Sequence, residues 1–159
     1  MRLVLAAALL AAAIPALARA GDIEVKGAEL RASIGHSPNS AAYMTLVNRG
    51  DKPDRLVSAA CACAGMVMVH RTEVSGGMAM MMDSPAVAIP AHGEAAFRPG
   101  GLHLMLMGLK KPLVDGSEQE ITLTFARAGQ VRAKFKVKAQ VDAAPPPAHP
   151  TPMGAMPGM

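Results

Sequence analysis

The chain has 159 residues, 51% of them hydrophobic, and a formal net charge of +4, which suits one domain with a buried core. The chain contains thirteen methionines but only three phenylalanines, one tyrosine and no tryptophan. With so few aromatic side chains and a predicted export signal, the composition argues against a nucleic-acid-binding protein.

The amino-terminal segment has the features of a secretory signal peptide. Arg2 precedes an apolar run over residues 3–17, and Ala18-Arg19-Ala20 supplies a small-x-small cleavage site. The run is shorter than the roughly 20 residues that span a bilayer, so an uncleaved anchor is the weaker alternative. We therefore expect removal of residues 1–20, a periplasmic mature protein and no stable membrane insertion.

The middle of the sequence, residues 21–141, predicts an all-β domain. The expected strands are 23–32, 42–47, 66–70, 78–82, 102–107, 121–126 and 131–138. Strands 66–70 and 78–82 should pair across Ser75-Gly76-Gly77, and the last two strands should pair around Ala128-Gly129. Short strands separated by Gly- and Pro-containing turns are typical of a β-sandwich.

After Val141 the composition changes, and residues 142–159 hold six of the thirteen prolines. A segment so rich in proline cannot pair as a strand and has little apolar surface to bury, so we expect a tail that is disordered without metal. Its candidate metal ligands are His149, Met153, Met156 and Met159. They suggest an auxiliary arm that collects copper, including Cu(II) at the imidazole; a linker of biased composition is the alternative.

A candidate metal site is formed by His70, Met81, His103 and Met105. Side chains at positions i and i+2 of a strand lie on one face, so His103 and Met105 should lie side by side while Leu104 faces the interior. The other two donors would come from the neighbouring hairpin. Thioether sulfur is a soft donor that suits Cu(I), and imidazole binds copper in either oxidation state.

Methionines elsewhere in the chain need no metal to explain them. Because methionine commonly fills irregular gaps in a core, we expect that role for Met44, Met66 and Met68.

The spacing His70-x10-Met81-x21-His103-x-Met105 resembles the signature of the periplasmic PCu(A)C-type copper chaperone family, and residues 42–51 and 99–109 agree with it. The resemblance covers roughly residues 22–141. It implies a cupredoxin-like Greek-key β-sandwich that binds one Cu(I) through two His and two Met and helps to supply copper to cytochrome c oxidase.

Cys61 and Cys63 require a separate account. Both precede His70, whereas a blue-copper site needs a cysteine close to its carboxyl-terminal ligands, so the chain is not a blue-copper protein. Three alternatives stay open for the pair: a disulfide across a turn at Ala62, auxiliary copper or redox chemistry, and free buried thiols.

We therefore predict a non-enzymatic, monomeric copper chaperone that delivers Cu(I) to an acceptor, either a cytochrome c oxidase subunit or another copper chaperone. A copper-sequestering or uptake protein would use the same donors. A thiol or copper reductase using Cys61 and Cys63 is the weaker alternative, because the Cys-x-x-Cys spacing of thioredoxin-like proteins is missing.

Overall fold

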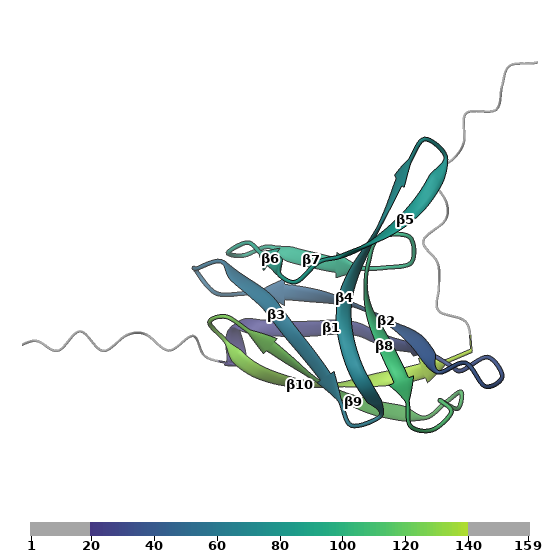
Figure 1. Cartoon of the computed structure of the whole chain (residues 1–159). Coiled ribbons are helices and arrows are strands. Elements are labelled where there is room, and N and C mark those ends of the chain that lie inside the picture. Colours follow the sequence, from purple (N-terminus) through teal and green to yellow (C-terminus); the bar gives the residue numbers. More distant parts are fainter. Residues whose placement is uncertain (1–19, 140–159) are drawn as a thin grey trace, which may run out of the picture.

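A computed structural model describes residues 20–139, and ten β-strands form its framework (Figure 1). A short 3-10 helix, η1 (Ala20–Asp22), precedes β1 (Ile23–Arg31), β2 (Asn39–Asn48), β3 (Asp54–Cys61), β4 (Ala64–Ser75), β5 (Met78–Asp83), β6 (Val87–Ile89), β7 (Glu94–Phe97), β8 (Leu102–Leu109), β9 (Glu118–Phe125) and β10 (Gly129–Lys138). Within residues 20–139 no helix has the length and apolar character needed to cross a bilayer. The expected signal peptide, apart from Ala20, and the expected tail lie outside the described residues.

The strands form a single mixed sheet. Their order is β5-β4-β8-β7-β2-β1-β10-β9-β3-β6, and β8 also pairs with β2. The β1–β10 and β7–β8 pairs are parallel, and the remaining pairs are antiparallel. The predicted all-β class is confirmed, with the inner faces of the strands meeting in one hydrophobic core.

Alternate residues of the longer inner strands supply that core. In β8, Leu104 and Leu106 are fully buried, and in β2 the buried positions Ala42, Met44 and Leu46 alternate with half-buried ones. This alternation follows from the pleat, which sends successive side chains to opposite faces. The expected core role of Met44 is confirmed.

A hairpin of β4 and β5 extends away from the rest of the sheet (Figure 1). Ser75 pairs with Met78 across Gly76 and Gly77, whose φ angles of 58° and 80° are those that a two-residue type I′ turn requires. Among the described strands β5 pairs with β4 alone, and every β5 residue is exposed. The predicted pairing across this turn is confirmed.

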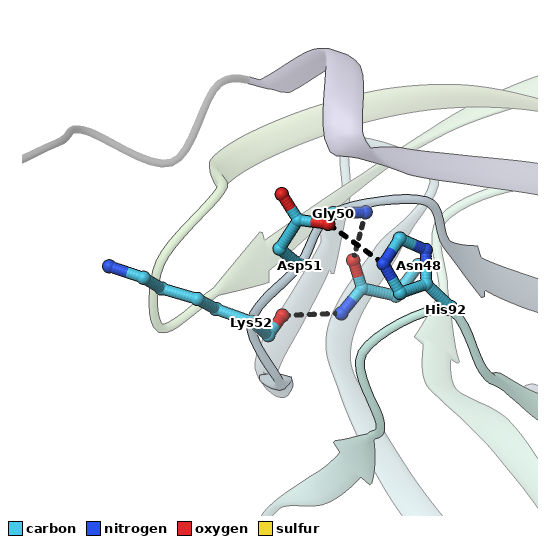
Figure 2. Close-up of polar contacts among 5 residues, drawn as sticks. All are labelled: Asn48, Gly50, Asp51, Lys52 and His92. Atoms are coloured by element: carbon cyan, nitrogen blue, oxygen red, sulfur yellow. Dashed lines mark hydrogen bonds and ion pairs between the residues drawn. The ribbon is translucent and has the colours of Figure 1, made fainter.

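A buried asparagine organises the loop after β2 (Figure 2). Asn48 is 2% exposed; its Nδ2 donates to the carbonyl of Lys52 at 2.8 Å, and its Oδ1 accepts from the N–H of Gly50 at 2.9 Å. Next to it, His92 Nε2 lies 2.8 Å from Asp51 Oδ1 on the surface. Because buried polar groups are costly unless they are hydrogen-bonded, we assign this segment a structural role.

The structure corrects the sequence analysis in two respects. Strands β3, β6 and β7 were not predicted. The expected core positions of Met66 and Met68 are wrong, because Met66 is 55% exposed and the half-buried Met68 is not part of the core. Met66 pairs with Met107 and has the same parity as His70, so it lies on the face of β4 that points away from the core.

Candidate metal centre

Strands β4 and β8 place two of the predicted ligands directly opposite each other. His70 pairs with His103 in the antiparallel register, and the two ring centroids lie 5.8 Å apart with the rings at 83°. Directly opposite residues share one face of a sheet, so both imidazoles project to the same side. Met105 lies two residues after His103 on the same face of β8. It pairs with Met68 of β4 and with Ala41 of β2.

This face is the one that points away from the core. Val69 and Leu104, the chain neighbours of the two histidines, pair with each other on the opposite face and are buried. The predicted inward orientation of Leu104 is therefore confirmed. The strand β8 thus offers His103 and Met105 on one side and packs the core with the other.

Met81 reaches the same face from the hairpin. It pairs with Thr72, which lies two residues beyond His70 on β4. The regular register sends Met78, Met80 and Met82 to the reverse face. Met81 is 64% exposed, and together with His103 and Met105 it lines a cleft of about 480 Å³.

A backbone contact orients the ring of His103, which is only 5% exposed. Its Nδ1 lies 3.1 Å from the carbonyl oxygen of Gly101, which also accepts from the N–H of Thr72 at 3.1 Å. A carbonyl can only accept, so this contact requires the proton on Nδ1 and leaves the Nε2 lone pair available for a metal. Such an outer contact is the usual partner of a metal-binding histidine.

His70 has no comparable support. Both of its ring nitrogens are buried and make no hydrogen bond; Nε2 lies 3.1 Å from Oδ1 of Asp83, but the geometry is not that of a hydrogen bond. A buried polar atom without a hydrogen bond is costly, and coordination of a metal would satisfy it. The donor set therefore fits a metal ion.

Asp83 is a neighbour of the site that the sequence analysis did not identify. It pairs directly with His70 in the hairpin register. The sequence contained the information for this pairing, because counting outward along both strands from the Gly76-Gly77 turn places position 83 opposite position 70.

The composition of the site determines which metals it suits. Within the described chain no three His, Cys, Asp or Glu side chains gather as a metal-binding group. A metal held by the predicted residues therefore depends on the thioethers of Met81 and Met105. Thioethers select soft ions, of which Cu(I) is the common biological one.

The lining of the cleft also contains polar side chains. These are Arg31 of β1 and Asn39, Ser40 and Tyr43 of β2. Burial raises the pKa of the Tyr43 phenol above its usual 10.0, and the charge of Arg31 opposes that rise. Tyr43 therefore remains a neutral hydroxyl at physiological pH.

The remaining predicted ligands lie elsewhere. Cys61, the last residue of β3, and Cys63 form a disulfide across the turn that leads into β4, and no cysteine in the described residues is free. In this state neither sulfur is a thiolate ligand, so copper binding by the reduced pair stays a prediction. His149, Met153, Met156 and Met159 lie outside the described residues.

Two curated proteins are similar to this chain in sequence. "Putative lipoprotein Lxx21020" of Leifsonia xyli subsp. xyli is 32% identical over 109 residues, which are 68% of this chain and 64% of the relative. "Uncharacterized protein RP573" of Rickettsia prowazekii is 34% identical over 105 residues, which are 65% of this chain and 58% of the relative. The match thus spans less than two thirds of the length of either relative.

Three solved structures share the fold. The copper-bound PCuAC domain from PmoF2 is 29% identical with a TM-score of 0.65, over 76% of this chain and 95% of that one. Cu(I)-bound DR1885 from Deinococcus radiodurans is 38% identical with a TM-score of 0.61, over 74% and 78%. Its apo form is 36% identical with a TM-score of 0.58, over 91% and 94%.

The family model described as "Putative lipoprotein LpqE-like" matches residues 23–137. This match begins with the first residue of β1 and ends one residue before the end of β10, so it covers the whole sheet. Together with the PCuAC structures, it confirms the resemblance to the PCu(A)C-type proteins: the chain belongs to the LpqE-like family.

Proposed function

We propose that the protein binds one Cu(I) through His70, Met81, His103 and Met105 and transfers it to an acceptor protein. The observation that carries the proposal is the opposed histidine pair. His103 has its Nδ1 held by a carbonyl, and His70 has two buried nitrogens without a hydrogen bond. Both lie on the sheet face that Met81 and Met105 share. The copper-bound structural relatives support the choice of metal.

The donors suit transfer as well as binding. Imidazole and thioether are neutral, so the bound ion keeps its positive charge, and each donor can be displaced in turn by a thiolate or imidazole of the acceptor. Met81 stands on an exposed strand at the edge of the cleft, where an incoming ligand would meet it first. The copper changes ligands without changing oxidation state, and the protein acts as a carrier and not as an enzyme.

The acceptor and the compartment belong to the same proposal. We expect a cytochrome c oxidase subunit or another copper chaperone as the acceptor, and a location outside the cytoplasm. The lipoprotein description of the family and of the Leifsonia relative supports export. The Cys61–Cys63 disulfide supports it independently, because disulfides persist in oxidising compartments.

Copper reduction by the cysteine pair receives no support from the fold. The pair lies in the β3–β4 turn, and His70 lies six residues after Ala64, the first residue of β4. At about 3.3 Å per residue, His70 is some 20 Å along the strand from that turn. A reductase would need the two groups in contact.

The double substitution of Met81 and Met105 by alanine tests the site. We expect it to weaken Cu(I) binding by more than about 100-fold, because two of the four donors are lost. Loss of a residue that only supports a ligand typically weakens metal binding by about 10- to 100-fold. Competition with a Cu(I) chelator measures the change. The matched control replaces two exposed methionines outside the set, Met66 and Met82, by alanine and should bind Cu(I) as the parent does.

Parental competition by the Met81/Met105 variant would show that the site is misplaced. The delivery step needs a second measurement, in which the Cu(I)-loaded protein is mixed with an apo copper domain of cytochrome c oxidase. Transfer supports a chaperone. Retention of the copper by a protein that otherwise binds it as proposed would favour sequestration or uptake.

A further inference from the structure

The reverse face of the β4–β5 hairpin carries a row of exposed methionines. Met78, Met80 and Met82 are 68%, 54% and 50% exposed, and all three lie on the face opposite to Met81. Methionine ordinarily fills gaps in a core, and none of these three does so. Their thioethers also take no part in the four-donor set, so the row needs another explanation.

The residues of β4 that pair with this row carry opposite charges at its two ends. Glu73 pairs directly with Met80, and Arg71 pairs directly with Met82. Directly opposite side chains have Cβ atoms about 5 Å apart, so a carboxylate stands beside Met80 and a guanidinium beside Met82. Nη1 of Arg71 and Oε1 of Glu73 lie 4.0 Å apart, at the limit of an ion pair, and both side chains are about half exposed. A cation is therefore favoured at the Met78–Met80 end and disfavoured at the Met82 end.

The spacing of the first two methionines suits one soft ion. Positions i and i+2 of a strand are about 6.8 Å apart, and the unbranched methionine side chain has three rotatable bonds, so two sulfurs can converge from that separation. Three sulfurs in a straight row reach a common point less easily, because the outer two start about 14 Å apart. Two thioethers are thus the natural donor pair for a soft ion, and the carboxylate of Glu73 lies near enough to attract the cation by its charge.

We propose that Met78 and Met80, assisted by the carboxylate of Glu73, form a second and weaker Cu(I) site on the reverse face of the hairpin. This site shares no ligand with the four-donor set and does not depend on it. Met81 follows Met80 directly and points to the other face of the same edge strand. A Cu(I) ion captured at the reverse face is therefore one residue from a ligand of the cleft, and it could be passed on by exchange of thioethers.

Methyl NMR of the full-length protein tests the proposal. The methionine methyl groups are labelled with carbon-13, assigned by single substitutions, and followed during anaerobic titration with Cu(I). We expect the first equivalent to shift Met81 and Met105 and a later one to shift Met78 and Met80. The variant M78L/M80L keeps similar volume at exposed positions but lacks both sulfurs. It should keep the first equivalent and lose the share of the later Cu(I) uptake that these two methionines supply, so that any later uptake left shifts only Met153, Met156 and Met159.

Two further variants act as matched controls. M82L, on the same face but beside Arg71, should bind Cu(I) as the parent does. E73Q should weaken the later equivalent roughly fourfold, the effect of one unit charge about 5 Å away in water. In M81A/M105A the shifts of Met78 and Met80 should persist, which separates failure of this site from failure of the four-donor site. The proposal is overturned if the Met78 and Met80 signals stay fixed while only carboxyl-terminal methionines respond, or if M82L removes the later uptake.

Discussion

Hydrogen bonding distinguishes the two histidines of the candidate site, because His103 makes a hydrogen bond and His70 makes none. The Gly101 carbonyl fixes one nitrogen of His103 and directs the other toward a ligand. His70 lacks such a partner and depends on a metal, or on a movement of Asp83, to satisfy its nitrogens. The two imidazoles are therefore unequal: a hydrogen bond holds the ring of His103, whereas the only polar contact of His70 among the described residues is the one with Asp83 at 3.1 Å.

A pair of single substitutions on β8 tests the assignment of its two faces. Met105→Leu keeps the side-chain volume but removes a sulfur from the donor face, so Cu(I) affinity should fall by roughly 10- to 100-fold. Leu104→Met adds a sulfur on the core face, where the side chain is fully buried, and should neither create a site nor rescue Met105→Leu. Chelator competition compares the parent with Met105→Leu, Leu104→Met and the double variant. Parental affinity in Met105→Leu would refute the face assignment.

The alternation of side chains along a strand allowed much of the candidate site's arrangement to be predicted from the sequence. The alternation in 102–107 already separated His103 and Met105 from Leu104, and the glycine turn already implied that positions 66–70 and 78–82 pair. The same parity was not applied to Met66, which shares the outer face with His70 and so could not enter the core. Side-chain hydrogen bonding, such as that of His103 with Gly101, depends on loop conformation and could not be predicted from periodicity.

Among the strands, the long ones with alternating buried and exposed residues were the ones that could be predicted from the sequence. Strands β2, β8, β9 and β10 have eight or more residues with alternating burial, and the sequence showed them. Strand β6 has three residues and β7 has four, too few for a period of two to stand out. Strand β3 pairs with β9 around a bulge between Leu56 and Ser58, which breaks its alternation.

The β3–β4 turn carries a prediction of its own. Replacement of Cys61 and Cys63 by serine removes a disulfide with a sequence separation of only 2. The chain-entropy model for so short a loop gives a loss of roughly 1–2 kcal/mol in the free energy of unfolding. Chemical denaturation of the parent and the variant measures it.

The same variant should retain the first Cu(I) equivalent, because the turn lies at the opposite end of β4 from the Gly76-Gly77 turn. Loss of that equivalent in a folded variant would show that the cysteines contribute to the principal site.

At the scale of the whole molecule, the two faces of the sheet hold different groups of side chains. The inner face holds the hydrophobic core, and the outer face of β4, β5 and β8 holds the four proposed donors. Donors on the outer face can change partners without disturbing the core. The same arrangement allows a projecting hairpin to carry thioethers on both of its sides, one facing the cleft and the other facing solvent.

Removal of residues 142–159 tests whether the sheet alone suffices. All four proposed donors lie between β4 and β8, and β10 ends at Lys138, so the shortened protein should fold with little change in thermal stability. It should still bind the first Cu(I). Because it lacks His149, Met153, Met156 and Met159, it should lose weaker copper uptake, most visibly of Cu(II), for which imidazole is a better ligand than thioether. Titration of both proteins with Cu(I) and with Cu(II) against competing chelators measures this difference, and His149→Ala in the full chain should reproduce the Cu(II) loss. If the shortened protein folds but loses its first Cu(I) equivalent, the carboxyl-terminal segment supplies a principal ligand and the four-residue assignment is wrong.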